Sequence, residues 1–248
     1  MEELILEYFY NLPSLTGSVA KWEEVIDEEL EARMEFLHLN KDNLSDDECR
    51  EYYGFLGEKS IIKRLMKCCQ PMCIIHDLFI KYNDIEIQND LLVVMSNAIL
   101  IIECKNWSGS FKVDEFGNFI KTKKYDLDLN EYTDIEIGVY SPVSQAIEHC
   151  NLIRCLIKEQ LFQEFHDIKS RCINSLIPLV VIGNEKTVVD LSFAPTDVKH
   201  EVIKYDQICR YVEQFIDSNC FHFTEHEIEE ISQKIINMDI NSENLIFI

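Results

Sequence analysis

The chain has 248 residues, 47% of them hydrophobic, so it is long enough for one large domain, or one medium domain with an appendage, around a buried core. Its formal net charge is −22, from 23 lysines and arginines against 45 aspartates and glutamates. Such an acidic surface repels polyphosphates at long range, which argues against indiscriminate nucleic-acid binding but leaves room for a local basic groove.

Both ends of the chain are predicted to be helical. In residues 1–55, apolar residues recur at steps of three and four, the spacing of one face of an amphipathic helix; they are Val19, Trp22, Val25, Ile26, Leu30, Met34 and Leu37. A polar break follows, in which Ser45 is a candidate N-cap. Residues 206–248 are predicted to form closing helices, the second of which begins with capping-box spacing at Thr224 and Glu227.

Between these ends, residues 56–205 change repeatedly between helical and strand patterns. In chain order we expect a helix from residue 57, strands over 72–80, 87–95 and 98–106, a hairpin over 109–123 with Gly117 in its turn, a loop over 125–140, a helix from residue 142, and strands over 175–184 and 200–205. Ser141 is expected to cap the second helix, with Pro142 at its first position. The inward face of that helix is expected to comprise Val143, Ala146, Ile147, Cys150, Ile153 and Ile157. The order of elements predicts a mixed α/β fold: a helix, three strands with a hairpin extension, a helix and a strand, with helical additions at both ends.

The opening residues and the cysteines indicate the compartment. No run approaches the roughly 18 apolar residues of a membrane span, and the opening stretch, MEELILEYFY, carries acids instead of the basic residues of a secretory signal. The ten cysteines lack the paired spacings of an extracellular disulfide framework. We therefore expect a cytoplasmic protein with reduced cysteines and no membrane partner.

Three charged residues stand near the ends of two strongly apolar predicted strands. Residues two apart in a strand share a face, so Glu103 and Lys105 are expected to point the same way. If the preceding strand pairs antiparallel with theirs, Asp90 lies opposite Glu103 on that face. Two carboxylates can bind Mg²⁺ together with water and a substrate phosphate, while a lysine offsets charge that develops on the phosphate. A structural ion-pair network at a sheet edge explains the spacing equally well.

Four short motifs add a family resemblance. They are Gly57-Glu58, Asp90-Leu91-Leu92-Val93-Val94, Ile101-Ile102-Glu103-Cys104-Lys105-Asn106-Trp107-Ser108-Gly109 and Ser141-Pro142-Val143-Ser144-Gln145. Together they resemble the NERD (nuclease-related) domain of the PD-(D/E)xK nuclease superfamily over roughly residues 54–185. The third motif is the most specific of the four, and the chain departs from the family pattern at Leu91, where histidine is common.

The resemblance implies a restriction-endonuclease-like core and a nuclease that uses Mg²⁺ or Mn²⁺ to cut DNA, with RNA left open as a substrate. Asp90 and Glu103 would ligate the metal, supported by Glu58 from the first core helix. Lys105 would assist the attacking water, and Gln145 would orient the lysine or the substrate phosphate. The same resemblance suggests a role in bacterial antiviral defence or in DNA processing.

Two groups of basic residues are candidates for nucleic-acid binding. Lys59 and Lys63, followed by Arg64 and Lys67, crowd the helix of Glu58. The second group lies at the end of the predicted hairpin and comprises Lys121, Lys123 and Lys124. If both groups flank the site, they form a positive groove in which binding depends strongly on salt. The alternative is that they are ordinary solvated faces.

Other functions remain open from the sequence. The chain has no glycine loop that could cradle a nucleoside triphosphate, so any motor activity would come from a partner such as an ATPase or helicase subunit. The alternative to an active nuclease is a catalytically silent or partner-activated scaffold that acts as a protein-interaction subunit, and homo-oligomerisation is a further option. A zinc site at Cys68, Cys69, Cys73 and His76 lacks a second paired half, so buried thiols are the favoured interpretation.

Overall fold

The computed structural model describes residues 28–68, 70–126, 132–164, 166–215 and 222–239. Most of the predicted N-terminal apolar stripe, and Cys69, therefore lie outside the described residues. Within them, α3 (Glu28–Leu39) buries Met34 and Leu37, as predicted. A short 3₁₀ turn, η1 (Lys41–Asn43), leads to the next helix.

The helix α4 (Asp46–Leu65) begins at the predicted cap. The Ser45 hydroxyl accepts a hydrogen bond from the backbone N of Glu48 at 3.3 Å, and the Glu48 carboxylate accepts one from the backbone N of Ser45 at 2.9 Å. This reciprocal pair satisfies two of the amide groups that a helix start leaves unpaired. The helix continues unbroken through residues 55–57, although Gly57 lies in its interior, where glycine is unfavourable. The division of the chain into regions 1–55, 56–205 and 206–248 stays a prediction.

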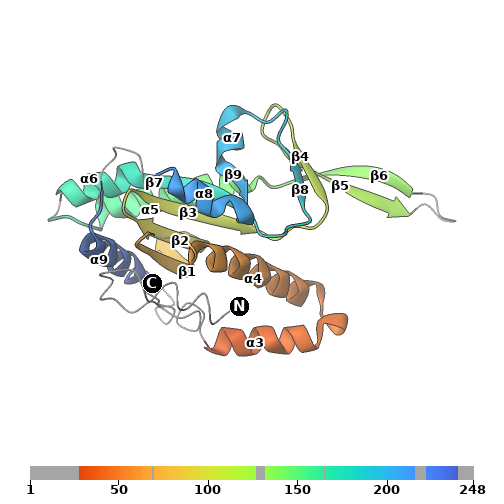
Figure 1. Ribbon diagram of the computed structural model, residues 1–248, viewed down its shortest axis with the longest axis horizontal. Coiled ribbons are helices and arrows are strands. Elements are labelled where there is room, and N and C mark those ends of the chain that lie inside the picture. The colour runs from red at the N-terminus through yellow and green to blue at the C-terminus, as the bar shows by residue number, and fades with distance from the viewer. Residues whose placement is uncertain (1–27, 69, 127–131, 165, 216–221, 240–248) are drawn as a thin grey trace.

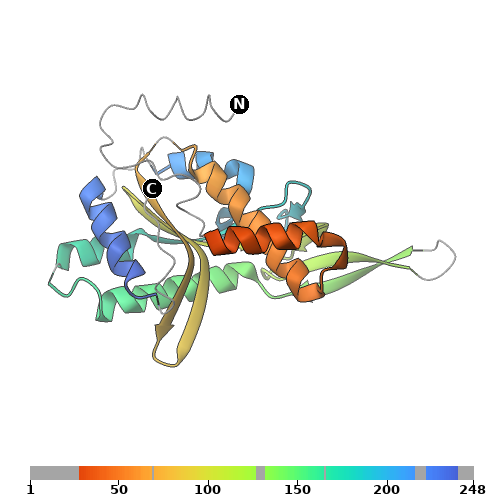
Figure 2. The same ribbon diagram turned by 90° about the horizontal axis from the view of Figure 1, so that it is seen from below.

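The main sheet has five strands in the order β1-β2-β3-β7-β9 (Figure 1). They are β1 (Met72–Tyr82), β2 (Ile85–Met95), β3 (Ala98–Lys105), β7 (Leu176–Ile182) and β9 (Val202–Lys204). The first three pair antiparallel, and β1 and β2 form a long curved hairpin (Figure 2). The strands β3, β7 and β9 pair parallel. The predicted mixed α/β fold is confirmed: α4, three strands, a helix and β7 follow in the expected order.

Helices cover both faces of this sheet and bury a separate core on each. On one face α4 packs on the sheet, and α3 and α8 (Ile208–Glu213) pack against α4 in the same core. On the other face lie α5 (Pro142–Glu159), α6 (His166–Ser175) and α9 (Glu225–Ile236). The central strands are therefore apolar on both faces, as expected for strands enclosed between two helical layers. Any charged side chain at the ends of these strands is held by the surrounding packing.

A second sheet holds the predicted hairpin and an additional strand. Its order is β6-β5-β4-β8, with bounds β4 (Ser110–Val113), β5 (Phe119–Asp126), β6 (Tyr132–Val139) and β8 (Val188–Asp190). The turn between β4 and β5 contains Gly117 at φ +84°, as predicted. The expected loop over 125–140 was wrong, because β6 pairs antiparallel with β5 in an arm that extends from the body (Figure 1). The sequence alternates Ile135, Ile137 and Val139 with polar residues or glycine, a strand pattern that the loop prediction overlooked, although most of the described residues of β6 are exposed.

The helix α5 starts as expected and exposes one residue that was predicted to be inward. The Ser141 hydroxyl accepts a hydrogen bond from the backbone N of Ser144 at 3.2 Å, and Pro142 opens the helix. Ile147 is 38% exposed, so its predicted burial was wrong, whereas the other five predicted inward residues of α5 are buried. Ile147 lies on α5 beside the apolar stripe that faces the sheet, not within it.

The remaining elements complete the C-terminal half. The short strand predicted over 200–205 is β9, preceded by α7 (Thr196–Glu201) and followed by the 3₁₀ turn η2 (Tyr205–Gln207). The elements α6, β8 and α7 were not predicted, because each is too short or too polar for a periodic pattern. The capping box of α9 is present at Thr224 and Glu227. No helix among the described residues is long and apolar enough to cross a membrane.

We expect Gly183→Ala to lower the free energy of unfolding by about 1–3 kcal/mol, the usual cost of overpacking. A Cβ atom at Gly183 would lie 2.7 Å from the Cα of Gly57, where α4 passes the end of β7. The neighbouring atoms are backbone and cannot move without shifting the helix. Urea denaturation measures the change. The matched control is Gly138→Ala, whose Cβ would meet nothing within 4 Å, and equal losses in both variants would contradict the prediction.

Stability in acid is expected to depend on an ion pair that joins α9 to α6. The Arg171 guanidinium donates to the Glu227 carboxylate and, together with the cap at Thr224, lowers the pKa of Glu227 to about 2. Because this pKa lies below the ordinary glutamate value, the ionised group stabilises the fold near neutral pH, and that contribution is lost as pH falls from about 4.5 towards 2. After allowance for solvent screening, we expect Glu227→Gln to cost about 1–2 kcal/mol at pH 7. Urea denaturation across pH 2–7 measures the free energy of unfolding. The difference between Glu227→Gln and the parent chain should vanish in acid, whereas the exposed control Glu229→Gln should not differ from the parent chain at any pH.

Candidate active site

The end of β3 carries a buried carboxylate bonded to a lysine. Glu103 is 1% exposed, and its Oε1 accepts a hydrogen bond from Lys105 Nζ at 2.5 Å. Lys105 Nζ also donates to Oε1 of Gln145, on the first turn of α5, at 3.3 Å. Residues two apart on β3 thus share a face, as predicted, and that face is turned towards α5. The lysine is held between the strand and the helix, with its side chain 23% exposed.

Asp90 reaches the same place from β2. The antiparallel register pairs Leu91 with Ile102, which puts Asp90 level with Glu103. Its Oδ2 accepts a hydrogen bond from the backbone N of Cys104 at 2.7 Å. Asp90 lies where the pairing of β1 with β2 is interrupted by Asp77, whose φ of +54° is unusual within a strand. The Asp90 carboxylate lies against β3, next to that of Glu103.

Burial and like charge act together on the two carboxyl groups. The pKa of Asp90 is raised well above its ordinary value, first by burial and then by the negative charges of Glu103 and Glu58. Burial also raises the pKa of Glu103, although Lys105 opposes that shift. Three acids thus share one neighbourhood with a single ammonium group. A cation placed between the carboxylates would relieve the repulsion that raises their pKa values.

Glu58 contributes from the opposite helix. Its Oε2 lies 2.8 Å from Nε2 of His76 on β1, and its side chain is 20% exposed. The charge of Glu58 acts on both Asp90 and Glu103. The structure therefore brings Glu58 within electrostatic reach of the pair but engages one of its oxygens with His76.

His149 belongs to the site and was missed in the sequence. It lies one turn after Gln145 on α5, with its side chain 8% exposed, and its Nδ1 is 3.7 Å from Oε2 of Glu103. Both of these atoms are buried, and within the described part of the chain neither has a hydrogen-bond partner. Burial lowers the pKa of His149, which favours the neutral ring. The sequence signal that could have identified His149 is its spacing from Gln145, because residues four apart on a helix share a face.

The residues present fit a hard divalent cation with an incomplete protein shell. Oε2 of Glu103 is a buried acceptor that receives no hydrogen bond from any described residue, and the carboxylate of Asp90 lies beside it. Across the described ranges, no three histidine, cysteine, aspartate or glutamate side chains are grouped so as to hold a metal by themselves. Mg²⁺ commonly binds through one or two carboxylates, with water and substrate phosphate completing the shell. The arrangement suits that mode better than a closed structural site.

The cysteines near β1 are buried in different cores. Cys68 packs with α4 on one face of the sheet, and Cys73 packs with α5 and α9 on the other. His76 is engaged by Glu58. This separation favours buried thiols over the zinc alternative.

The residues that follow Lys105 join the two sheets. Asn106 Nδ2 donates to the backbone oxygen of Tyr53 on α4 at 2.5 Å, and the Trp107 ring stacks on Phe111 with centroids 4.2 Å apart. Gly109 then turns the chain into β4 at φ +94°. The Asn-Trp-Ser-Gly segment of the third motif therefore ties the end of β3 to α4 and to the second sheet, which holds Lys105 in place.

The basic residues lie on separate elements. Lys59 and Lys63 are on α4, and Lys59 Nζ lies 5.4 Å from the centre of the Phe55 ring. Lys121 is on β5, with its Nζ 5.2 Å from the centre of the Phe111 ring. The side chains of Lys123 and Lys124 lie outside the described residues. The predicted role of all five in nucleic-acid binding stays a prediction.

The comparisons with known proteins agree with this architecture. A mixed α/β core that brings acids and a lysine together at the ends of paired strands is consistent with a nuclease-like fold. A family model described as the nuclease-related domain, NERD, matches residues 53–182. The chain therefore belongs to the NERD family, and the resemblance seen in the sequence is confirmed. No curated protein and no solved structure matches the chain.

Proposed function

We propose that this protein is a nuclease that hydrolyses DNA phosphodiester bonds with the help of Mg²⁺ or Mn²⁺. The observation that supports the proposal best is the convergence of Asp90 and Glu103 from adjacent strands on Lys105, which Gln145 holds from α5. Surface ion pairs are usually exposed, whereas Glu103 is fully enclosed in this group. A buried group of like charges is stabilised when it binds something of opposite charge.

Each residue has a role that follows from its contacts. Asp90 and Glu103 would hold the cation, which when bound polarises the phosphate and activates a water molecule. The Lys105 ammonium would donate to the attacking water or to a phosphoryl oxygen and offset the charge that develops there. Gln145 would orient Lys105, and His149, on the same face of α5, lies beside Oε2 of Glu103. Glu58 would add negative charge that favours binding of the cation.

The proposed cellular role, in antiviral defence or in DNA processing, rests on membership of the NERD family. Defence against foreign DNA or processing of the cell's own DNA both require a nuclease that is restricted to particular ends or structures. The net charge of −22 provides part of this restriction, because it slows encounters with DNA except where basic residues gather. A partner with ATPase or helicase activity could supply the substrate.

A cleavage assay tests the proposal directly. The purified chain is incubated with single-stranded DNA, duplex DNA and RNA of one sequence, in EDTA, Mg²⁺ or Mn²⁺. We expect DNA cleavage only with a divalent cation. Equal cleavage in EDTA would contradict metal dependence, and cleavage of RNA alone would contradict the proposed substrate.

A scaffold without activity is the second candidate function. It is favoured by the strong negative charge and by the incomplete set of protein ligands among the described residues. The two candidates differ in metal binding, because a ligand that binds the folded state raises the melting temperature with concentration. A melting temperature unchanged by millimolar Mg²⁺ or Mn²⁺, without cleavage, would support the scaffold.

A further inference from the structure

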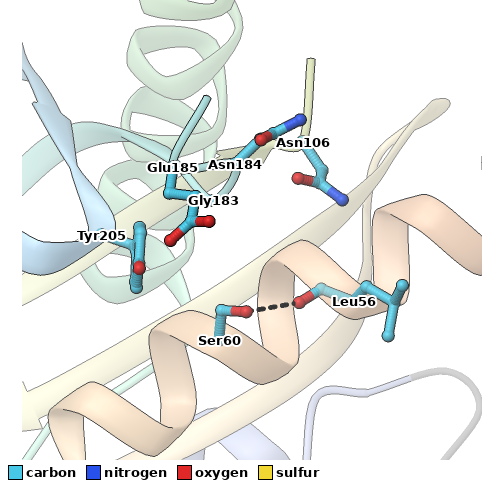
Figure 3. Close-up of a pocket in the computed structure, with 7 residues that line it drawn as sticks. All are labelled: Leu56, Ser60, Asn106, Gly183, Asn184, Glu185 and Tyr205. Carbon is cyan, nitrogen blue, oxygen red and sulfur yellow. Dashed lines mark hydrogen bonds between the residues drawn. The ribbon is translucent and has the colours of Figure 1, made fainter. Parts of the chain in front are cut away.

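A pocket of about 290 Å³ opens beside the proposed active site, between α4 and the loops that follow β3 and β7 (Figure 3). Its lining comes from four segments and comprises Leu56, Ser60, Asn106, Gly183, Asn184, Glu185 and Tyr205. This volume is at the lower end of the roughly 300–1,000 Å³ of typical ligand pockets. It suits one flat ring system better than a large ligand.

The pocket starts one residue beyond Lys105. Asn106 follows the lysine directly, and the backbone N of Gly183 donates to the backbone oxygen of Lys105 at 3.0 Å. Because β3 and β7 run parallel, their carboxyl ends open at the same edge of the sheet, where α/β sheets bind ligands. The Lys105 side chain faces α5, whereas the pocket lies on the α4 side of the same strand ends. A nucleic-acid strand that passes round this edge of the sheet would present a phosphate to Lys105 and a neighbouring base to the pocket.

The walls are held by contacts that do not depend on a ligand. The close approach of Gly57 and Gly183 sets the distance between α4 and the loop after β7. Lys204 Nζ donates to the backbone oxygen of Glu185 at 2.6 Å, and the Arg64 guanidinium lies 5.5 Å from the centre of the Tyr205 ring. The pocket is thus largely preformed, which reduces the entropy cost of binding.

The lining matches a nucleobase and disfavours a phosphate. Tyr205 supplies an aromatic ring, and Asn106 and Asn184 supply amide groups (Figure 3). Nδ2 of Asn106 and Oδ1 of Asn184 already bond backbone groups of Tyr53 and Lys186, which leaves Oδ1 of Asn106 and Nδ2 of Asn184 for a base. The Ser60 hydroxyl donates to the backbone oxygen of Leu56 at 2.8 Å and can still accept a hydrogen bond. The Glu185 carboxylate would repel a phosphate but accepts hydrogen bonds from the amino groups that bases carry. Phosphates are better placed outside the pocket, near Lys105.

We propose that this pocket receives the base of an unpaired nucleotide next to the phosphate that is cut. The inference rests on the proposed nuclease function and deepens it, since it names single-stranded or frayed DNA as the preferred substrate. A base within a duplex is stacked and paired, so it reaches such a pocket only after it is pulled out of the helix at an energetic cost. Stacking on an aromatic side chain is tolerant of sequence, so the preference is for unpaired bases of any kind.

Binding of labelled oligonucleotides to the full chain in EDTA tests the inference without cleavage. Fluorescence anisotropy compares a single strand, a fully abasic strand of equal length and charge, and a duplex. We expect the single strand to bind more tightly than the abasic strand by roughly 5- to 150-fold, the range for base–aromatic stacking. In Tyr205→Ala this advantage should disappear, in Tyr205→Phe it should remain, and in the exposed-aromatic control Phe193→Ala it should be unchanged.

A second variant and the cleavage assay separate the possible failures. Ser60→Leu fills the pocket from α4 and should also remove the preference for bases, which covers the case in which Tyr205→Ala does not fold. A parent chain that binds the abasic strand as tightly as the normal strand overturns the inference, as do folded variants that keep the preference. If the variants lose the preference for bases but the parent chain shows no metal-dependent cleavage, the result supports the pocket and contradicts the nuclease proposal. Cleavage without a preference for bases contradicts the pocket alone.

Discussion

Replacement of Glu103 by glutamine is expected to lower metal-dependent DNA cleavage by about 100- to 10,000-fold, since a catalytic metal supplies several kcal/mol of transition-state stabilisation. Glutamine has nearly the same shape but lacks the charge that would bind a cation. The buried Oε2 of Glu103, which has no hydrogen-bond partner among the described residues, is the atom whose loss matters most. Single-turnover rates at saturating Mn²⁺ measure the effect on catalysis.

The same variant separates catalysis from folding. Burial raises the pKa of Glu103, so the charged carboxylate is unfavourable in the metal-free protein. Glu103→Gln should therefore leave the metal-free melting temperature unchanged or higher, while the increase caused by Mn²⁺ becomes smaller. The control is Glu136→Gln, which removes another carboxylate bonded to a lysine, Lys112, in the second sheet. Cleavage within about threefold of the parent chain in Glu103→Gln would exclude Glu103 from the mechanism.

Lys105→Met is expected to reduce cleavage by about 100- to 1,000-fold, the usual effect of removing a group that stabilises transition-state charge. Methionine keeps most of the aliphatic chain but removes the ammonium group that bonds Glu103 and Gln145. Cation binding should survive, because the carboxylates of Asp90 and Glu103 remain. The loss should appear in kcat more than in the metal concentration that gives half-maximal activity.

Stability provides an independent measure of the lysine's role. Removal of Lys105 leaves the buried Glu103 without its compensating charge, which is costly in the metal-free chain. The melting temperature of Lys105→Met should therefore be lower without metal and should rise further on addition of Mn²⁺ than that of the parent chain. Lys112→Met, which breaks the exposed pair with Glu136, should show neither effect. An unchanged kcat in Lys105→Met would contradict the proposed catalytic role of Lys105.

Local interactions account for most of what could be predicted from the sequence. The N-cap at Ser45 and the capping box at Thr224 involve residues three apart, and both occur as predicted. The hairpin of β2 and β3 joins Asp90 to Glu103 across a tight turn, so alternation along the strands was enough to place them together. The elements β8 and α7 were not predicted because they are too short to show a period, whereas the alternation of Ile135, Ile137 and Val139 in β6 was present and was overlooked.

What the sequence by itself determined is therefore the order of the main elements, the family motifs and the pairing of acids within one hairpin. Only the tertiary structure decided which helix residues meet that pair: Gln145 and His149 from one face, and Glu58 with His76 from the other. It also decided that β7 lies parallel to β3, which brings Gly183 beside Lys105 and opens the pocket. These contacts join residues from about 20 to 80 positions apart, and periodicity carries no information over such distances because it reports only the face that a residue presents. The packing of both helical layers on one sheet selects the partners of each face.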